Sequence, residues 1–386
     1  MQKDNRFKWL DVITITFTHF IHDVYTFFLP PLQIILMEKL AINNFMFGLL
    51  SMVQRTPTLL NPFIGIVAER LRMRYLMIFA PFFTALFMSL IGVVPNFTTL
   101  CIIIFLSGLS SSLFHVPTPV MIRHISGDKT GKGMSFYMFG GNFARTLSPV
   151  IILGVVELWG LNGILNLIPA GALASLILFI RYRKVDLRKD FKKADLPSEG
   201  SYIEVFRKYA KLLISIVSIT LFTGLLKSCI TYFLVGYLEM KGFNPVISKL
   251  GLTIVYLSGS LGVFASGTVS DYIGKRTTVL LCILLAPVFM LIFIHMSGNW
   301  QLPFLALSGF FTLATVPVFL SIVNSIDSKH LPFLNGTYMT INFLASASAT
   351  LLVGWGNDML GYQQMFLIGT ILSLLAVPFA LMLPKK

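Results

Sequence analysis

The sequence predicts an all-α membrane protein with twelve transmembrane helices in two pseudo-symmetric six-helix bundles. Composition is the first observation that supports this: of the 386 residues, 55% are hydrophobic and only 12% are charged, and the mean hydropathy is +0.80. A soluble domain carries about 25% charged residues. The composition therefore excludes a soluble globular enzyme, a disordered chain and a disulfide-stapled secreted domain. Continuous apolar runs also argue against an outer-membrane barrel, whose strands alternate apolar and polar residues.

The second observation is a series of twelve apolar runs, each long enough to cross a bilayer. They are separated by charged residues or by Gly, Pro and Asn, and they cover 9–37, 45–68, 75–94, 98–122, 134–158, 161–181, 211–237, 247–270, 277–296, 300–323, 333–355 and 362–383. The longest polar stretch, 182–210, is predicted to be a basic cytoplasmic linker. It divides an N-terminal bundle, 1–181, from a C-terminal bundle, 211–386.

Basic residues predict the orientation of these helices. Most of the 30 Lys and Arg residues fall in the loops on one side, and only Lys39, Lys241 and Lys249 fall on the other. Because basic loops stay in the cytoplasm, we expect both termini to be cytoplasmic. The net charge of +14 then needs no nucleic-acid partner. The first run is too long for a cleavable signal peptide.

An internal repeat is the third observation. The stretch Gly65–Arg70 after the second span matches Gly267–Tyr272 after the eighth. In the fourth span Leu106–Gly108, followed by Val116 and Pro117, matches Leu307–Gly309, followed by Val316 and Pro317, in the tenth. Both matches occur at nearly the same offset, as expected for two homologous halves of a transporter.

The second copy of the loop motif resembles the cytoplasmic signature of the major facilitator superfamily. It consists of Gly267, Asp271, Gly274, Lys275 and Arg276. The first copy, which contains Gly65, Glu69 and Arg70, departs from this signature because Glu69 replaces the aspartate and Arg72 stands where glycine is usual. The resemblance implies a major facilitator fold. It also implies a cytoplasmic gate, in which glycine permits close helix contact and charged residues latch helix ends.

A narrower resemblance concerns three motifs of the first half. His19–Leu32, Gly108–His115 and Gly140–Phe143 are similar to the first, fourth and fifth helices of the fosmidomycin-resistance-type branch, which contains drug/proton antiporters. This resemblance implies proton-driven transport of small molecules, usually drug efflux, across a bacterial inner membrane. Two departures are that Val116 to Pro119 lack the glutamate of the branch, and that Arg145 replaces a small residue.

Ionisable residues inside the spans are the candidates for function. Each costs about 2.5–3.5 kcal/mol on insertion scales, so such groups usually face a cavity or a partner. Away from predicted helix ends they are His19, His22, Asp23, Arg55, His115, Arg145 and Lys227.

Three of these residues share one face of the first helix, because His19, His22 and Asp23 stand at i, i+3 and i+4. We expect Asp23 to accept the coupling proton and the histidines to relay protons or contact substrate. The alternative is a hydrogen-bonded patch that holds this helix to a neighbour.

The expected substrate-binding residues are Arg145, Lys227, Arg55, His115, Asn142 and Tyr25, with Tyr137 as a weaker candidate. By the repeat offset, Lys227 falls next to the position that corresponds to Asp23. Three fixed cations then face a single acid, which favours an anionic substrate such as a carboxylate or phosphonate. The alternative for Arg145 and Lys227 is a structural, charge-neutralising pairing with Asp23.

These features favour a proton-coupled secondary transporter that moves a small organic anion by alternating access. The resemblance to the fosmidomycin-resistance-type branch implies efflux of an anionic drug or metabolite. Uptake of an anionic siderophore or metal chelate is the first alternative. A non-transporting membrane receptor is the second, although it leaves the buried charges without a task.

Other chemistry is not expected. The chain lacks a Gly-x-x-x-x-Gly-Lys-Ser/Thr phosphate loop, a Gly-x-Ser-x-Gly elbow and a His-Glu-x-x-His pair, so we predict no enzyme activity, no ATP drive and no cofactor. Three histidines could bind a transition ion, but one carboxylate and three cations oppose a bare ion, and we predict no metal site. The expected partners are an anionic small molecule, protons and the lipid bilayer, and we expect a monomer.

Overall fold

The computed structural model of the protein describes residues 7–61, 64, 74–127, 130–184, 202–324, 326 and 331–384. Within these residues the regular structure is helical, without strands, and eleven helices are long and apolar enough to cross a membrane. The predicted second span, 45–68, is described in part, as α3 (Asn44–Arg55) and the 3-10 helix η2 (Thr56–Leu60). The twelve-helix prediction is thus consistent with every described segment.

Contacts between Cα atoms divide the chain into two compact units. The first contains Met1–Leu32 and Val53–Ala194, and the second contains Gln33–Met52 and Asp195–Lys386. Residues 33–52 precede the predicted linker in sequence but contact the helices that follow it. Each unit is described separately below.

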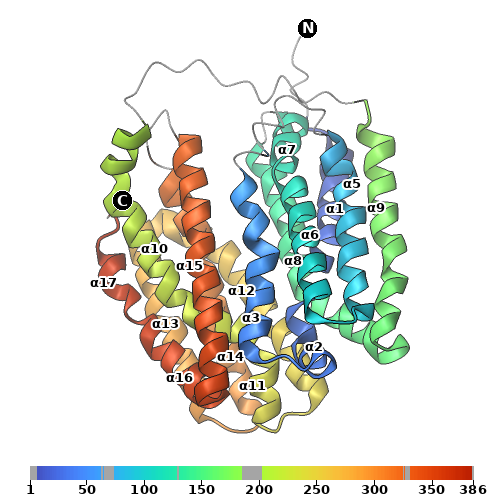
Figure 1. Cartoon of the computed structure of the whole chain (residues 1–386). Coiled ribbons are helices and arrows are strands. Elements are labelled where there is room, and N and C mark those ends of the chain that lie inside the picture. Colours follow the sequence, from blue (N-terminus) through green and yellow to red (C-terminus); the bar gives the residue numbers. More distant parts are fainter. Residues whose placement is uncertain are drawn as a thin grey trace. The chain divides into compact units, whose positions relative to one another are not determined.

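The first unit is a bundle around α1 (Trp9–Thr26), which contacts α5 (Arg74–Leu90), α8 (Thr130–Trp159) and α9 (Ile168–Tyr182) (Figure 1). It also contains α6 (Phe97–His115), the short α7 (Thr118–Ser126) and the 3-10 helices η3 (Ile91–Val93) and η5 (Leu161–Leu167). Its core includes Val12, Ile15, Met77, Phe114 and Leu178, all fully buried. Such burial of apolar side chains holds the polar face of α1 in place.

The predicted first helix, 9–37, is interrupted in the structure. After α1 the chain forms a 3-10 turn, η1 (Pro30–Leu32), and then α2 (Gln33–Leu40). Pro30 and Pro31 lack backbone N–H groups, and proline disfavours α-helical geometry at the residue before it. The prolines therefore end α1 one turn beyond its polar cluster.

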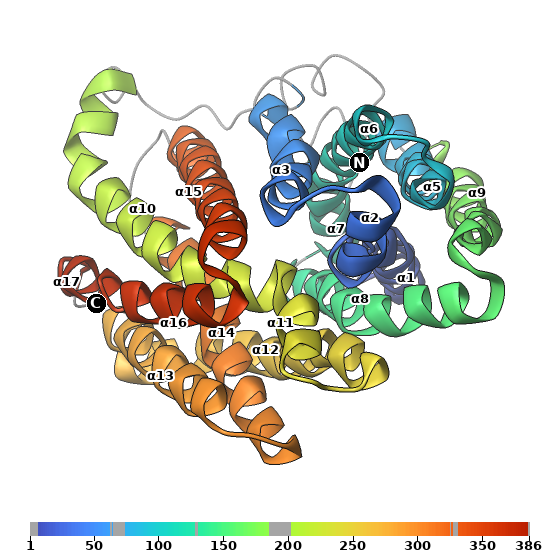
Figure 2. The same ribbon diagram turned by 60° about the horizontal axis from the view of Figure 1, so that its bottom comes forward.

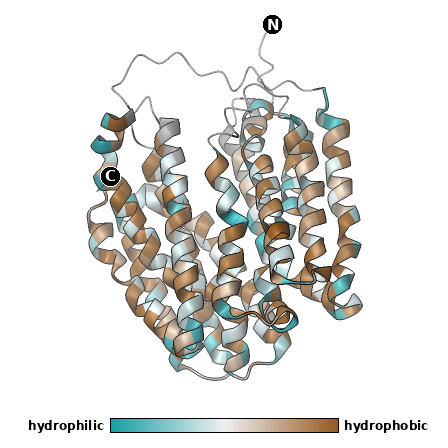
Figure 3. Ribbon diagram, in the orientation of Figure 1, coloured by the Kyte–Doolittle hydropathy of each residue, from teal (hydrophilic) through white to brown (hydrophobic). Residues whose placement is uncertain are grey.

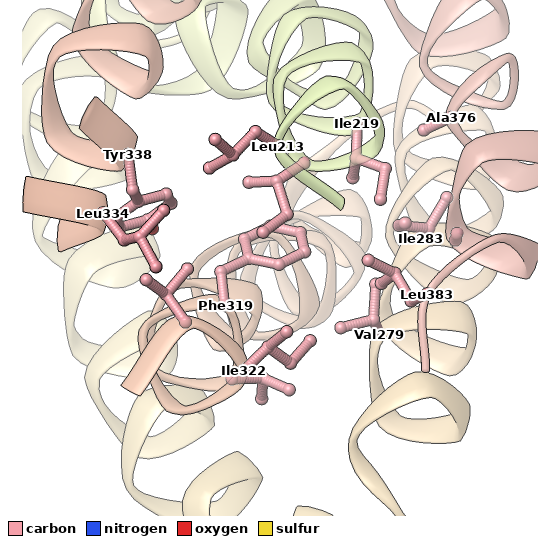
Figure 4. Close-up of a cluster of buried hydrophobic side chains, with 14 of the residues drawn as sticks. Leu213, Ile219, Val279, Ile283, Phe319, Ile322, Leu334, Tyr338, Ala376 and Leu383 are labelled. Carbon is pink, nitrogen blue, oxygen red and sulfur yellow. The ribbon is translucent and has the colours of Figure 1, made fainter. Parts of the chain in front are cut away.

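The second unit contains α2, most of α3, and eight later helices (Figure 2). These are α10 (Tyr202–Tyr232), α11 (Leu234–Met240), α12 (Pro245–Ile273), α13 (Lys275–His295), α14 (Leu302–Asn324), α15 (Leu331–Leu360), α16 (Tyr362–Ser373) and α17 (Ala376–Leu381), with η6 (Asn299–Gln301) before α14. Helix α14 packs against both α12 and α13, and α10 packs against α15 and α16. An apolar cluster that includes Leu213, Ile219, Val279, Ile283 and Phe319 joins α10, α13 and α14 (Figure 4).

Helix α10 begins at Tyr202, nine residues before its predicted start at 211. The early turns carry charged residues, and for that reason the sequence assigns them to the linker. They form helix because Val205 is buried in the apolar cluster of Figure 4 and Tyr209 packs against it. An amphipathic turn can thus extend a helix beyond its apolar run.

A carboxylate caps the start of α3. The side chain of Asp358 in α15 accepts hydrogen bonds from the backbone N–H of Asn44 (2.9 Å), from its Nδ2 (2.9 Å) and from the backbone N–H of Phe45 (2.8 Å). The Tyr362 hydroxyl donates to Oδ1 of Asn44 at 2.6 Å. First-turn N–H groups have no partner within a helix, and a negative group there also favours the helix dipole. These bonds fasten α3 to α15 and α16.

Large apolar side chains lie exposed on both units. Phe264 is 83% exposed and Ile180 is 67% exposed, and the helices are apolar along most of their length (Figure 3). In water such a surface would be unfavourable. It fits helices surrounded by lipid.

Candidate functional site

The first copy of the cytoplasmic motif, with Gly65, Glu69 and Arg70, lies outside the described residues. In the second copy, Asp271 belongs to α12 and Arg276 to the first turn of α13. Gly274 separates these helices with a φ of 87°, a conformation that favours glycine. Lys275 donates from Nζ to the carbonyl of Ser321 in α14 at 3.1 Å.

The expected close helix contact at Gly267 stays a prediction, because among the described residues a Cβ atom added there would meet nothing within 4 Å. Close approach occurs instead at Gly108 in α6, where an added Cβ would lie only 1.8 Å from the carbonyl oxygen of Gln54. In the described residues the close helix contact is therefore at Gly108 and not at Gly267.

The clearest polar site is a cluster of four side chains inside the first unit. Three are the predicted residues of α1: His22 is 0% exposed, Asp23 is 3% exposed and His19 is 4% exposed. The fourth is His115 at the end of α6, whose side chain is 38% exposed. The cluster is thus buried within the bundle and open at His115.

Asp23 lies at the centre of this cluster. Its Oδ1 atom is 2.9 Å from Nδ1 of His22 and 3.2 Å from Nε2 of His115, and its Oδ2 atom is 3.2 Å from Nε2 of His19. A carboxylate out of water is costly unless it is paired and hydrogen-bonded. Three imidazoles supply that environment.

Glycine lets α8 approach the polar face of α1. A Cβ on Gly141 would lie 2.8 Å from Cε1 of His19 and 2.9 Å from Oδ2 of Asp23, and one on Gly140 would lie 2.6 Å from the carbonyl oxygen of Thr16. Distances under 3 Å are shorter than van der Waals contact, so a side chain at either position would push the helices apart. The pair therefore explains why the Gly140–Phe143 motif accompanies the histidine motif.

Tyr137 of α8 positions two of the histidines. Its carbonyl oxygen lies 2.8 Å from Nδ1 of His19, its ring stacks on the His19 ring with centroids 3.9 Å apart, and its hydroxyl lies 3.0 Å from Nδ1 of His115. Because a carbonyl only accepts, Nδ1 of His19 is the donor. A contact of this kind fixes the tautomer of the ring.

The consequence for His19 is electrostatic. With its proton on Nδ1, a neutral ring would present an unprotonated Nε2 to the Asp23 carboxylate, acceptor against acceptor. This Nε2 is buried and, apart from Oδ2 of Asp23 at 3.2 Å, has no polar partner among the described residues. One added proton, on His19 or on Asp23, turns the contact into a hydrogen bond. The geometry is therefore suited to binding a proton.

A cation is a second possible occupant of the same space. His19, Asp23 and His115 offer one potential ligand atom each within 4.8 Å of one another. His22 adds none, because its two nitrogens already contact Asp23 and Thr84. Three ligand atoms are fewer than the four of a closed structural zinc site, although open catalytic sites also use three.

Arg145 lies on α8, four residues after Gly141. Its guanidinium is 4.7 Å from the centroid of the Phe27 ring, a cation–π contact. Its Nε atom is buried and has no hydrogen-bond partner among the described residues. Residues four apart share a helix face and lie about 6 Å apart along the axis. Arg145 therefore carries unused hydrogen-bonding capacity one turn from the cluster.

The remaining candidates are placed as follows. Tyr25 is buried and donates its hydroxyl to the carbonyl of Leu167 at 2.6 Å, a packing role within the bundle. Asn142 and Arg55 are half-buried in the first unit. Lys227 is half-buried in α10 of the second unit, so its pairing with Asp23 stays a prediction.

Sequence analysis missed Thr84 of α5 and Ser110 of α6, both buried beside His22. Ser110 lies inside the Gly108–His115 motif, so the family resemblance of that motif could have pointed to it. Thr84 stands in an apolar run without ionisable residues, where a hydroxyl usually bonds its own helix backbone.

Comparison with known proteins places these features in a family. A sequence profile of the Major Facilitator Superfamily matches residues 15–325 and 216–386. The fosmidomycin resistance protein of Escherichia coli is 21% identical over 366 residues, which cover 94% of this chain and 90% of that protein. The multi-drug resistance efflux pump PmrA of Streptococcus pneumoniae is 23% identical over 336 residues, covering 84% of this chain and 82% of the pump.

A solved structure shares the fold. It is a bacterial homologue of the human lysosomal transporter Spinster in an inward-facing, unoccupied conformation, which superposes with a TM-score of 0.79 at 10% identity. The match covers 98% of this chain and 97% of the homologue. At this identity the likeness concerns the fold alone.

Proposed function

The chain belongs to the Major Facilitator Superfamily of membrane transporters, and we propose that within it the protein couples the movement of a small organic anion to protons. The observation that carries this proposal is the buried Asp23 with its three imidazoles, at 2.9, 3.2 and 3.2 Å. Groups that must gain or lose protons in a buried, partly open site are suited to proton coupling.

The anionic substrate class rests on Arg145. Its planar guanidinium suits a carboxylate or phosphonate, and its buried Nε has no protein partner among the described residues. In addition, Arg145 shares helix α8 with Gly141, which packs against the cluster of Asp23 and its three histidines, called the proton cluster below. A change of one charge in the cluster therefore acts on a bound anion about one helical turn away, in a region of low dielectric constant.

Efflux is the proposed direction, by exchange of the anion with protons. Its support is the pair of relatives named for resistance and efflux. The proposed location is a bacterial inner membrane, with both termini in the cytoplasm as the basic loops predict and with a monomer as the working unit. Alternating access would then require the two units to move relative to each other.

The test uses the purified chain in proteoliposomes with an imposed pH gradient. The probes are fosmidomycin as a phosphonate anion, ethidium as a cation, uridine as a neutral solute and a ferric citrate chelate for the uptake alternative. We expect gradient-dependent movement of the phosphonate, abolished by a protonophore, and none of ethidium or uridine. Transport of ethidium without the phosphonate would refute the anionic class, and movement of the chelate alone would favour uptake.

A further inference from the structure

A chain of hydrogen bonds leads from the proton cluster into neighbouring helices. Nε2 of His22 lies 3.1 Å from Oγ1 of Thr84, Thr84 donates to Oγ of Ser110 at 2.8 Å, and Ser110 donates to the carbonyl oxygen of Ala80 at 2.9 Å. Thr84 and His22 are fully buried, and Ser110 is 4% exposed. The side chains of this hydrogen-bond network are therefore shielded from bulk water.

The number of available protons determines which group donates in each of these hydrogen bonds. The Ala80 carbonyl has no proton, so Ser110 supplies one, and Thr84 then gives its only proton to Ser110. Nε2 of His22 must therefore donate to Thr84. The other ring nitrogen, Nδ1, lies 2.9 Å from Oδ1 of Asp23, and this contact also needs a proton.

The available groups fall one proton short. A neutral imidazole and two hydroxyls supply three protons, whereas the contacts His22–Asp23, His22–Thr84, Thr84–Ser110 and Ser110–Ala80 number four. The fourth proton has to reside in the His22–Asp23 pair, as a doubly protonated ring beside a carboxylate or as a neutral ring beside a carboxylic acid. When the pair loses it, Thr84 must turn to donate to Nε2, and one buried contact is left without a proton.

The second unit provides an internal comparison. There too a serine of one helix binds the carbonyl of an alanine that precedes a helical proline, because Ser308 of α14 donates to Ala286 of α13 at 3.0 Å. Three residues after that proline stands the buried Met290, whereas Thr84 stands three residues after Pro81. Both units thus contain a serine–carbonyl contact, and among the described residues the first unit alone extends it through a hydroxyl to a histidine.

The charged surroundings of the His22–Asp23 pair come from each packed helix. Helix α1 adds His19 and α6 adds His115. Helix α8 adds the neutral Tyr137 and, about one turn from Gly141, the cation Arg145, while α5 faces the ring with the neutral Thr84. The ring also stacks on Phe114, with centroids 4.3 Å apart. These groups set the proton affinity of the pair. The two hydroxyls of Thr84 and Ser110 raise it further, because they require Nε2 of His22 to donate.

From this geometry we propose that Thr84 and Ser110 are positioning residues that hold the coupling proton on the His22–Asp23 pair. The inference rests on the proposed proton coupling and assigns it to a pair rather than to Asp23 alone. Removing either hydroxyl takes away the need for Nε2 of His22 to donate, so it weakens the hold on the proton.

The experiment is a ¹⁵N NMR titration of histidine-labelled protein in lipid bilayers, with the His22 signal assigned from a His22→Asn sample. Variants are Thr84→Val, Ser110→Ala, the conservative Thr84→Ser, and Ser308→Ala as the matched control in the second unit. For Thr84→Val and Ser110→Ala we expect the pair to lose its proton about one pH unit lower, a tenfold loss of proton affinity. Thr84→Ser and Ser308→Ala should titrate like the unmodified protein.

Several results would overturn the proposal: an unchanged titration in Thr84→Val, a Thr84→Ser variant that behaves like the valine, or an equal shift in Ser308→Ala. Thermal unfolding of each variant in detergent shows that it is folded before it is compared. The outcome is separate from that of the proposed function, because the titration needs no substrate. If a pH gradient does not drive transport by the unmodified protein in liposomes, the proposed proton coupling is wrong. The assignment of the proton to the His22–Asp23 pair is decided by the titration alone.

Discussion

Nε2 of His19 lies 3.2 Å from Oδ2 of Asp23, while Nδ1 of the same ring is held 2.8 Å from the carbonyl of Tyr137. The second contact fixes which nitrogen faces the acid, so the first is favourable only when a proton lies between the two groups. A backbone carbonyl on α8 thereby orients a side-chain ring on α1. Without a proton between them, the His19 nitrogen and the Asp23 oxygen would face each other as two acceptors, an unfavourable contact in addition to the one that the His22–Asp23 pair makes.

Asp23→Asn should abolish transport driven by a pH gradient and leave downhill exchange of substrate intact. The amide keeps the size and most contacts of the carboxylate but cannot ionise. The measurement is uptake of labelled anion with and without a gradient, compared with counterflow. Glu157→Gln, at an exposed position in the last turn of α8, is the control and should behave like the unmodified protein. Gradient-driven uptake in Asp23→Asn would show that the coupling lies elsewhere.

Arg145→Gln should weaken anion binding about tenfold or more, the value of a charge-assisted hydrogen bond. Arg145→Lys should recover only part of this loss, because an ammonium lacks the planar fork. Affinity is measured by ligand-dependent thermal stabilisation. The control is Arg183→Gln, since Arg183 also lies over a phenylalanine ring, at 5.6 Å, but is exposed at the end of α9. Equal losses in both variants would point to a general charge effect.

Gly141→Ala should lower both stability and transport. Its Cβ would lie 2.8 Å from His19 and 2.9 Å from Asp23, which forces α8 away from α1 at a cost of about 1–3 kcal/mol. Gly154→Ala on the same helix meets nothing within 4 Å in the part of the chain that the structure describes, so it should be neutral or slightly stabilising. Thermal unfolding in detergent separates the two, and equal melting temperatures would contradict the close approach.

Asp358→Ala should destabilise the second unit by about 1–2 kcal/mol, as expected for loss of a helix cap. Three N–H groups at the start of α3 lose their acceptor in this variant. The neighbouring Met359→Ala, at a position 66% exposed, serves as control. A melting temperature for Asp358→Ala that matches this control would mean that water replaces the cap without cost.

The sequence predicted the polar face of α1 because spacing along a helix determines which side chains share a face. It also singled out His115 and Arg145, since an ionisable group in an apolar run is costly and conspicuous. Thr84 escaped notice because a hydroxyl in such a run is common. The sequence predicted one continuous helix over 9–37, and the structure shows that it is broken at Pro30 and Pro31. The association of 33–52 with later helices depends on tertiary packing, which no local sequence pattern encodes.

The serine–carbonyl contact shared by the two units has an evolutionary implication. The internal repeat pairs Ser308 with Ser107 and not with Ser110, so each half reaches an alanine carbonyl from a serine at a different position of its helix. Among the described residues a threonine, where the second half has a methionine, completes a polar relay in the first half. One copy can then acquire new chemistry through a point substitution while its twin keeps the helices in register. In a redesigned carrier, Met290→Thr would supply the matching hydroxyl, and a histidine that faces it would have to be added as well.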